Sequence, residues 1–188
     1  MNPQTTPEQQ YEVLDENGHK TGELLDKSVV HKGQLWHEVV NVWVINSRQE
    51  ILMQLRAPGV ELSPNVWDVT TGTHLRPGEV PVLAALRTLQ TELGINTAAE
   101  SLRHLFNIQS ANPMPNGMLH KVFGHVYLLR DDADINALTF DKEKISQLAW
   151  VPMMKLMADV GNEETKKNYF PRANDYYPQL FEAFQAWL

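Results

Sequence analysis

The segment from Gly72 to Ile95 limits the fold of this chain more than any other, since it combines a loop, a helix and a sharp helix stop. Pro77 and Gly78 close the loop, and Pro81 suits the first turn of a helix, where its missing N–H is not needed. Gly94 suits the position just after the last turn, where positive φ angles are common. Between them, apolar residues recur at helical spacing: Val82, Leu86, Leu89 and Leu93. The pattern predicts a helix from about Pro81 to Leu93 with this stripe facing the core.

Polar and charged side chains accompany this helix. Glu79 precedes it and Arg87 lies inside it, so an ion pair between them would fix the loop to the helix. Thr88, Thr91 and Glu92 lie at i, i+3 and i+4 and therefore share one helix flank. Glu92 is a candidate metal ligand on that flank, whereas the two hydroxyls supply no charge to a cation such as Mg²⁺.

Apolar and β-branched runs elsewhere predict strands. We expect a hairpin of Tyr11–Leu14 and Lys20–Leu24, then strands at Glu38–Asn46, Glu50–Leu55, Val66–Thr71, Leu102–Gln109, Met118–Leu129 and Gln147–Val151. Two more helices are expected at Met153–Val160 and Tyr176–Leu188, and polar loops at Asp26–Gln34, Gly72–Gly78 and Gly161–Ala173. This order favours an α/β (α+β) fold, a mixed β-sheet sandwiched between helices.

The length of 188 residues suits one domain with a substantial core. Residues 1–10 are polar and contain two prolines, so we expect a disordered tail followed by a single domain over 11–188. The N-terminus lacks the basic start and apolar run of a signal peptide, and no stretch has the apolar length of a membrane span. A cytoplasmic location without a membrane partner is the expectation, and a homodimer stays an open alternative.

Composition excludes several kinds of site. The chain has no cysteine, which rules out disulfides, thiolate metal sites and a cysteine nucleophile. The formal charge of −7 argues against a general nucleic-acid partner. It does not argue against a phosphorylated small molecule, because a metal ion or a few arginines can neutralise such a ligand. Arg56 and Arg76 are the candidate phosphate contacts.

Residues 73–95 resemble the signature motif of the Nudix superfamily, the Nudix box. Glu79 and Arg87 have the separation of that motif, and Leu89, Glu92, Gly94 and Ile95 are in register. The resemblance implies the Nudix fold and a hydrolase that acts on a nucleoside diphosphate or another diphosphate-linked small molecule. It also implies Mg²⁺ or Mn²⁺ held by Glu92 and Glu79, with both carboxylates catalytic and Arg87 holding Glu79 in place. Thr88 and Thr91 replace Glu residues of the motif, so a weakened site is expected.

A second resemblance, from about Tyr11 to Pro152, is to the Nudix branch of the isopentenyl diphosphate isomerases. It is carried by Tyr11–Gly18, Val30-His31, Trp36-His37, Ile51–Arg56 and Trp67-Asp68. Those enzymes use a cysteine in the loop before the signature, where this chain has Gly72, so isomerisation by that mechanism is not expected. Their metal is held by three His and two Glu residues. The His positions are matched by His31, His37 and His74, while His120 and Val122 fall near the Glu positions.

A site made of histidines alone is therefore an alternative to the magnesium site. His37 and His74, with His31 and His120 as further candidates, would suit a transition metal better than Mg²⁺. For any one of these residues taken alone, a hydrogen-bonded structural role is the simpler interpretation.

Two functional hypotheses remain open. The first is a metal-dependent hydrolase whose general base is a carboxylate such as Glu143. The second is a binding or regulatory module that keeps the Nudix cleft but lacks efficient turnover. The sequence determines neither the substrate nor the metal.

Overall fold

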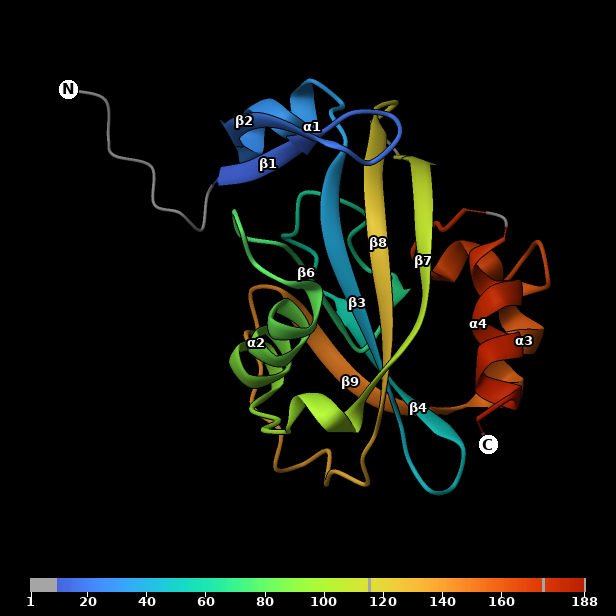
Figure 1. Ribbon diagram of the computed structural model, residues 1–188. Coiled ribbons are helices and arrows are strands. Elements are labelled where there is room, and N and C mark those ends of the chain that lie inside the picture. Colours follow the sequence, from blue (N-terminus) through green and yellow to red (C-terminus); the bar gives the residue numbers. More distant parts are fainter. Residues whose placement is uncertain (1–9, 115, 174, 188) are drawn as a thin grey trace.

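A computed structural model describes residues 10–114, 116–173 and 175–187 (Figure 1). The strands are β1 (Gln10–Leu14), β2 (Lys20–Asp26), β3 (His37–Ile45), β4 (Glu50–Arg56), β5 (Trp67–Asp68), β6 (Thr71–His74), β7 (Leu102–Pro113), β8 (Leu119–Arg130) and β9 (Ile145–Pro152). The helices are α1 (Lys27–Lys32), α2 (Pro81–Leu93), α3 (Met153–Val160) and α4 (Tyr176–Gln185), with 3₁₀ turns at Ala99–Ser101 and Lys166–Asn168. Most of the predicted tail, and Leu188 of the predicted last helix, lie outside the described residues, but Gln10 already belongs to β1.

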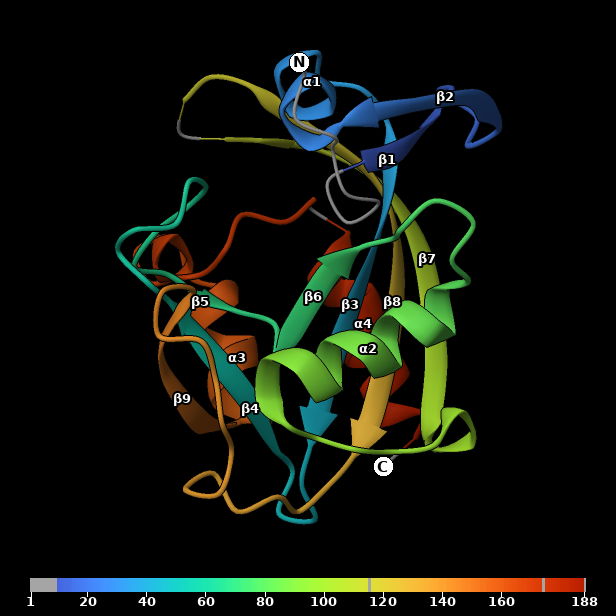
Figure 2. The ribbon, with the colours of Figure 1, turned by 90° about the vertical axis from the view of Figure 1, so that its left-hand side faces the viewer.

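A mixed seven-stranded sheet forms the centre, with β5, β4, β3, β8 and β7 side by side. β3 runs parallel to β8 over its whole length, and β7 runs antiparallel to β8. On its other edge β3 has two partners, because its middle residues, Val39–Val42, pair with β6 and its last two residues pair with β4. β9 pairs with β4, so β6 and the β4–β5–β9 group form two separate arms that leave β3 (Figure 2).

β3 explains why the core has two halves. Its alternate side chains Val40, Val42 and Val44 pack with α2, whereas Trp43 and Ile45 pack with α3 and α4 on the opposite face. Figure 1 shows α2 on one side of the sheet and α3 with α4 on the other. The predicted fold class, a mixed sheet between helices, is thus confirmed. Over the described residues, no helix is both long and apolar enough for a bilayer crossing.

Helix α2 has the predicted bounds and ends at Gly94 with a φ of 69°. Its buried face differs from the predicted stripe, since Ala84, Ala85 and Thr88 are buried together with Leu89 and Leu93. Val82 and Leu86 are only half-buried at the border of the core. Ala84 and Ala85 thus take central positions in the buried face, and Val82 and Leu86 lie at its border.

Two segments that were predicted as loops are regular in the structure. Gly72–His74 of β6 lie in the predicted Gly72–Gly78 loop, where backbone pairing with β3 replaces any signal in side-chain type. α1 lies in the predicted Asp26–Gln34 connection, and it is held by Val30, which packs with Tyr11 and Val13 of β1. Both errors arise from tertiary contacts that override weak local propensity.

Candidate functional site

Four histidines from separate elements meet at one end of the sheet. His31 lies on α1, His37 opens β3, His74 closes β6, and His120 is the second residue of β8. One nitrogen from each ring lies within 4.8 Å of the others. The two Nε2 atoms of His31 and His74 are 3.3 Å apart, close to the roughly 3.3 Å expected between nitrogens that share a tetrahedral Zn²⁺ ion. We call this set the four-histidine cluster.

The cluster presents neutral imidazoles with available lone pairs. Burial lowers the pKa of His37 to about 4 and that of His120 to about 3. Burial also lowers the pKa of His74 well below its ordinary value and that of His31 in the same direction. His37 Nδ1 donates to the Leu35 carbonyl at 2.9 Å, which leaves the lone pair on its Nε2.

Two buried nitrogens of the cluster have no hydrogen-bond partner in the described part of the chain. They are His37 Nε2 and His120 Nε2. Since buried polar atoms are nearly always satisfied, such a pair calls for a ligand. Four nitrogen donors suit Zn²⁺ or another transition metal, and they do not suit Mg²⁺, which prefers oxygen. The residues present therefore fit a transition-metal ion.

The predicted pair of Glu79 and Arg87 lies beside the cluster but is occupied by its own contacts. Glu79 Oε1 accepts from Arg87 Nε at 2.8 Å, and Glu79 Oε2 accepts from Arg87 Nη2 at 2.7 Å and from the Arg76 backbone N–H at 2.8 Å. Arg87 Nη2 also donates to the backbone carbonyl of His74 at 3.2 Å. Both carboxylate oxygens of Glu79 thus make protein contacts, and Arg87 ties the helix to the end of β6.

The helix flank that was predicted to hold metal is largely neutral and mostly buried. Thr88 is 1% exposed, and its hydroxyl lies 2.8 Å from that of Thr71 on β6. Thr71 donates in turn to Glu92 Oε2 at 2.5 Å. Thr91 is exposed and donates to the Arg87 carbonyl, so it does not join the other two as predicted. Glu92 is therefore the single carboxylate in the hydrogen-bonded series Thr88, Thr71 and Glu92.

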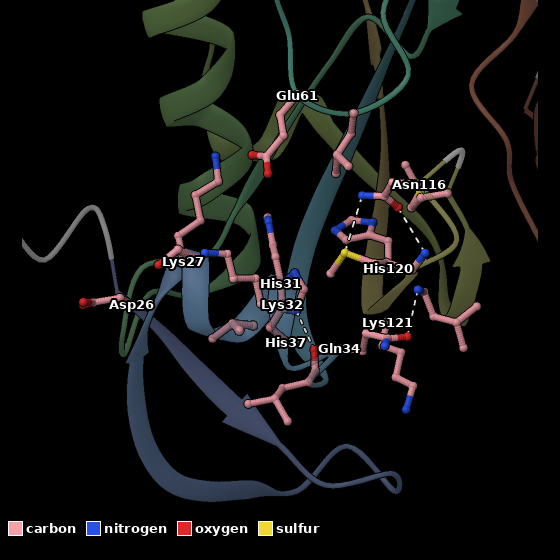
Figure 3. Close-up of a pocket in the computed structure, with 17 residues that line it drawn as sticks. Asp26, Lys27, His31, Lys32, Gln34, His37, Glu61, Asn116, His120 and Lys121 are labelled. Carbon is pink, nitrogen blue, oxygen red and sulfur yellow. Dashed lines mark hydrogen bonds between the residues drawn. The ribbon is translucent and has the colours of Figure 1, made fainter.

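An open cleft of about 800 Å³ connects the two sites. Its lining includes His31 and His74 of the cluster, Glu92 of the helix flank, and Arg56 and Glu143 from the surrounding loops. A second hollow of about 500 Å³, shown in Figure 3, has His31, His37 and His120 on its wall. The four-histidine cluster therefore lies between two openings to the surface.

The two predicted phosphate contacts occupy different places. Arg56 lines the cleft, although its guanidinium already pairs with Asp68 at 3.1 Å and donates to the carbonyls of Leu62 and Ser63. Arg76 is not among the residues that line either hollow, and its backbone supports Glu79 instead.

One functional candidate was missed from the sequence. Arg172 lies in the predicted Gly161–Ala173 loop, yet its side chain is largely removed from solvent and reaches Asp68 and Asn41. A single arginine in an irregular segment carries no periodic signal, and only the neighbouring Phe170-Pro171 marks the stretch as less polar than a surface loop.

Comparisons with known proteins agree with this architecture. The model of the NUDIX domain matches residues 35–173. Nudix hydrolase 3 of Arabidopsis thaliana is 28% identical over 93% of this chain, although the match spans only 23% of that protein. The isopentenyl-diphosphate Delta-isomerase of Pectobacterium atrosepticum is 35% identical over 93% of this chain and 96% of its own length.

A solved structure shares the fold at lower identity. The crystal structure of DR0079 from Deinococcus radiodurans superimposes with a TM-score of 0.69 and 22% identity, covering 93% of this chain and 99% of that one. At that identity the likeness concerns the fold alone. The match of the family model and the relative at 35% identity show the family, and the structural likeness agrees with them in fold. The chain belongs to the NUDIX domain family.

Proposed function

We propose that this protein is a metal-dependent hydrolase of a small molecule that contains a diphosphate linkage, with a transition-metal ion bound by the four-histidine cluster. The observation that carries the proposal is the position of this cluster on the wall of the cleft that also contains Glu92 and Glu143. When bound, a divalent transition metal polarises phosphoryl oxygens and makes a coordinated water more acidic.

The residues of the chain itself would divide the remaining work. His31, His37, His74 and His120 would hold the ion. Arg56 would face the phosphates across the cleft. Glu143 is exposed on the cleft wall and is a candidate general base, while Glu92 is restrained by Thr71 and by Lys144 at 4.0 Å. Glu79 and Arg87 would position the end of β6.

Isomerisation is not part of the proposal, although an isomerase is among the relatives. The chain has no thiol to move the proton. The backbone at Gly72 also leaves no room for one, because a Cβ there would lie 2.9 Å from the Val40 carbonyl oxygen.

A binding module without efficient turnover is the second candidate. Thr88 and Thr91 replace carboxylates on the helix flank, and four imidazoles can fill the coordination sphere of a tetrahedral ion. Such a protein would retain metal and ligand binding in the same cleft but would release no phosphate.

The test combines a metal series with a substrate screen. The purified protein is stripped by a chelator, reloaded separately with Zn²⁺, Mn²⁺, Ni²⁺, Co²⁺ or Mg²⁺, and incubated with nucleotide sugars and dinucleotides, in which a diphosphate joins two groups. The phosphomonoester products are then treated with a phosphatase in a second step, and the released phosphate is measured. We expect turnover with at least one transition metal and little with Mg²⁺. The His37→Gln variant should lose this activity, whereas His19→Gln, which alters an exposed histidine outside the cluster, should retain it.

Three outcomes separate the candidates. Phosphate release that survives His37→Gln would contradict the role of the cluster. Tight metal binding without release of phosphate from any substrate would favour the binding module. Conversion of isopentenyl to dimethylallyl diphosphate above a no-enzyme control would contradict the exclusion of isomerisation.

A further inference from the structure

A smaller cavity of about 150 Å³ lies beside the four-histidine cluster. It shares His120 with the surface hollow of Figure 3, and Arg56 and His74 with the open cleft. His74 and His120 form one part of its wall, and Arg172 forms another. Its volume is below the roughly 300 Å³ at which pockets for whole drug-sized ligands begin. The cavity can therefore take one end of a substrate but not a nucleoside.

Arg172 is held in this wall by a fixed set of contacts. Its guanidinium forms an ion pair with Asp68 through Nη2 and donates from Nη1 to Asn41 Oδ1 at 3.3 Å. The Cζ atom of Arg172 lies 4.9 Å from the ring centre of Phe170 and 4.8 Å from that of Tyr176. The side chain is 9% exposed, so the charge is preorganised and removed from water.

The charges around the cavity do not balance. Asp68 is the acidic residue of its lining, and it is shared by two cations, Arg172 and Arg56, the second at 3.1 Å. Although burial acts in the opposite direction, the Asp68 carboxylate raises the pKa of Arg172. Guanidinium groups in general stay charged in proteins. The lining thus carries one positive charge in excess, and an anion next to Arg172, whose side chain is mostly removed from water, would neutralise it.

A hydrogen-bond donor is also left over. Arg172 Nε is buried and has no acceptor among the described residues. The remaining wall offers short polar groups that can complete a binding shell for oxygen atoms: Asn41, Gln54, Ser110 and Asn112. A guanidinium with a free N–H in such surroundings is suited to an oxyanion.

We infer that this cavity is an anion subsite, in which Arg172 binds a compact carboxylate or phosphate group at the end of the substrate that lies next to the four-histidine cluster. The inference rests on the proposed function for the identity of the substrate, but the subsite itself is a property of the side chains on its wall. It narrows the substrate class to molecules with a second small anionic group and disfavours those that would bury a nucleobase here.

A purely structural role for Arg172 explains fewer of these observations. The ion pair with Asp68 alone would attach the segment after α3 to the sheet. It would account neither for the unsatisfied Nε nor for a hollow lined by hydrogen-bonding groups. The two roles differ in a measurable way, because only the subsite binds a free anion.

The test uses inorganic phosphate and acetate as probes on the full-length protein, both as purified and after metal removal. The Nε–H signals of arginine are followed by heteronuclear NMR at constant ionic strength, and the Arg172 signal is identified by its loss in Arg172→Lys. At least one probe should shift the Arg172 signal in a saturable way, and this shift should persist after the metal is removed. Calorimetry should show binding weakened about tenfold or more in Arg172→Lys, because a charge-assisted donor is lost.

Arg48→Lys is the matched control, since Arg48 pairs with a single carboxylate, Glu50, on the surface. Its anion affinity should stay within about twofold of the parent, as for surface substitutions generally. If Arg172→Lys does not fold, the Nε signal can be assigned by through-bond correlations in the labelled parent protein.

Two results would overturn the subsite. One is an Arg172 Nε signal that neither probe shifts in a saturable way. The other is anion binding that disappears completely with the metal. Failure of the proposed hydrolysis is a separate result, because the anion titration does not depend on turnover.

Discussion

The four-histidine cluster and the α2 flank lie along the same cleft but are built from opposite kinds of groups. The cluster gathers four nitrogen donors from four elements, two of them buried and unsatisfied. The flank gathers hydroxyls: Thr88 is hydrogen-bonded to Thr71, and Thr71 donates to the single carboxylate, Glu92. The donors of the cluster thus fit a transition-metal ion, whereas the flank lacks most of the carboxylates that Mg²⁺ prefers.

The difference shows that a family motif can keep the geometry of its loop and helix while the donor groups on the helix change. Glu79 and Arg87 still attach the loop to the helix and the helix to β6. The same helix position that carries Glu in the motif is here Thr88, buried at 1% exposure. The scaffold of a magnesium site can therefore persist while its donors change.

The largest effect is expected from removing two of the cluster's ligands. The double variant His37→Gln with His120→Gln should weaken Zn²⁺ binding by about 10³-fold or more, because half of the nitrogen donors are lost. Competition against a chromophoric chelator measures the affinity. His19→Gln should leave it unchanged, and an unaltered affinity in the double variant would place the metal elsewhere.

The next effect separates the two hydroxyls of the flank. Thr88→Glu places a carboxylate in a buried position beside Glu92, so we expect a loss of about 3–4 kcal/mol in the free energy of unfolding. Thr91→Glu is exposed and should change it by no more than about 0.5 kcal/mol. Denaturant unfolding with and without Mg²⁺ measures both. Equal effects of the two substitutions would contradict the orientation of this flank.

Helix register gives a third contrast. Leu89→Ala removes a side chain with no exposed surface, and the expected cost is about 3 kcal/mol. Leu86→Ala lies at the border of the core, where water can refill the space, and should cost less than half as much. Chemical denaturation of the two variants compares them directly. A larger loss of unfolding free energy for Leu86→Ala than for Leu89→Ala would support the buried face that the sequence predicted.

The smallest effect concerns the ion pair that the motif retains. Glu79→Gln should cost about 1–2 kcal/mol at neutral pH, since one charge-assisted pair with Arg87 is weakened. Burial acts to raise the pKa of Glu79, but its bonds to Arg87 and to the Arg76 backbone lower it below the ordinary 4.5. The stabilisation is therefore present above about pH 4.5 and is lost as pH falls through the folded pKa.

Unfolding curves across this pH range test the pair. The difference between parent and Glu79→Gln should shrink as the solution is acidified below about pH 4.5, the ordinary value of a Glu carboxyl. A difference that stays constant down to pH 3 would mean that charge does not contribute to the contact.

Much of the fold was predictable because it depends on local pattern. The bounds of α2 and α3 follow from Pro, Gly and apolar spacing, and the β3–β4 hairpin follows from its apolar runs. β6 and α1 were not predictable, since their short polar sequences become regular only through pairing with β3 and packing of Val30. The candidate site was likewise predictable only in part: His37 and His74 were identified by the family resemblance, whereas Arg172 was not identified from the sequence.

The sequence by itself determined the family, the absence of any thiol chemistry and the loss of carboxylates at positions 88 and 91. These depend on residue identity and spacing along the chain, which folding cannot change. Only the tertiary structure showed that four histidines lie close together and that Thr91 is exposed and bonded to its own helix backbone. It also showed that the largely desolvated Arg172 lacks an acceptor for its Nε–H among the described residues. The physical reason is that donor convergence, burial and charge balance depend on distances between residues far apart in sequence, and only the packed sheet and helices set those distances.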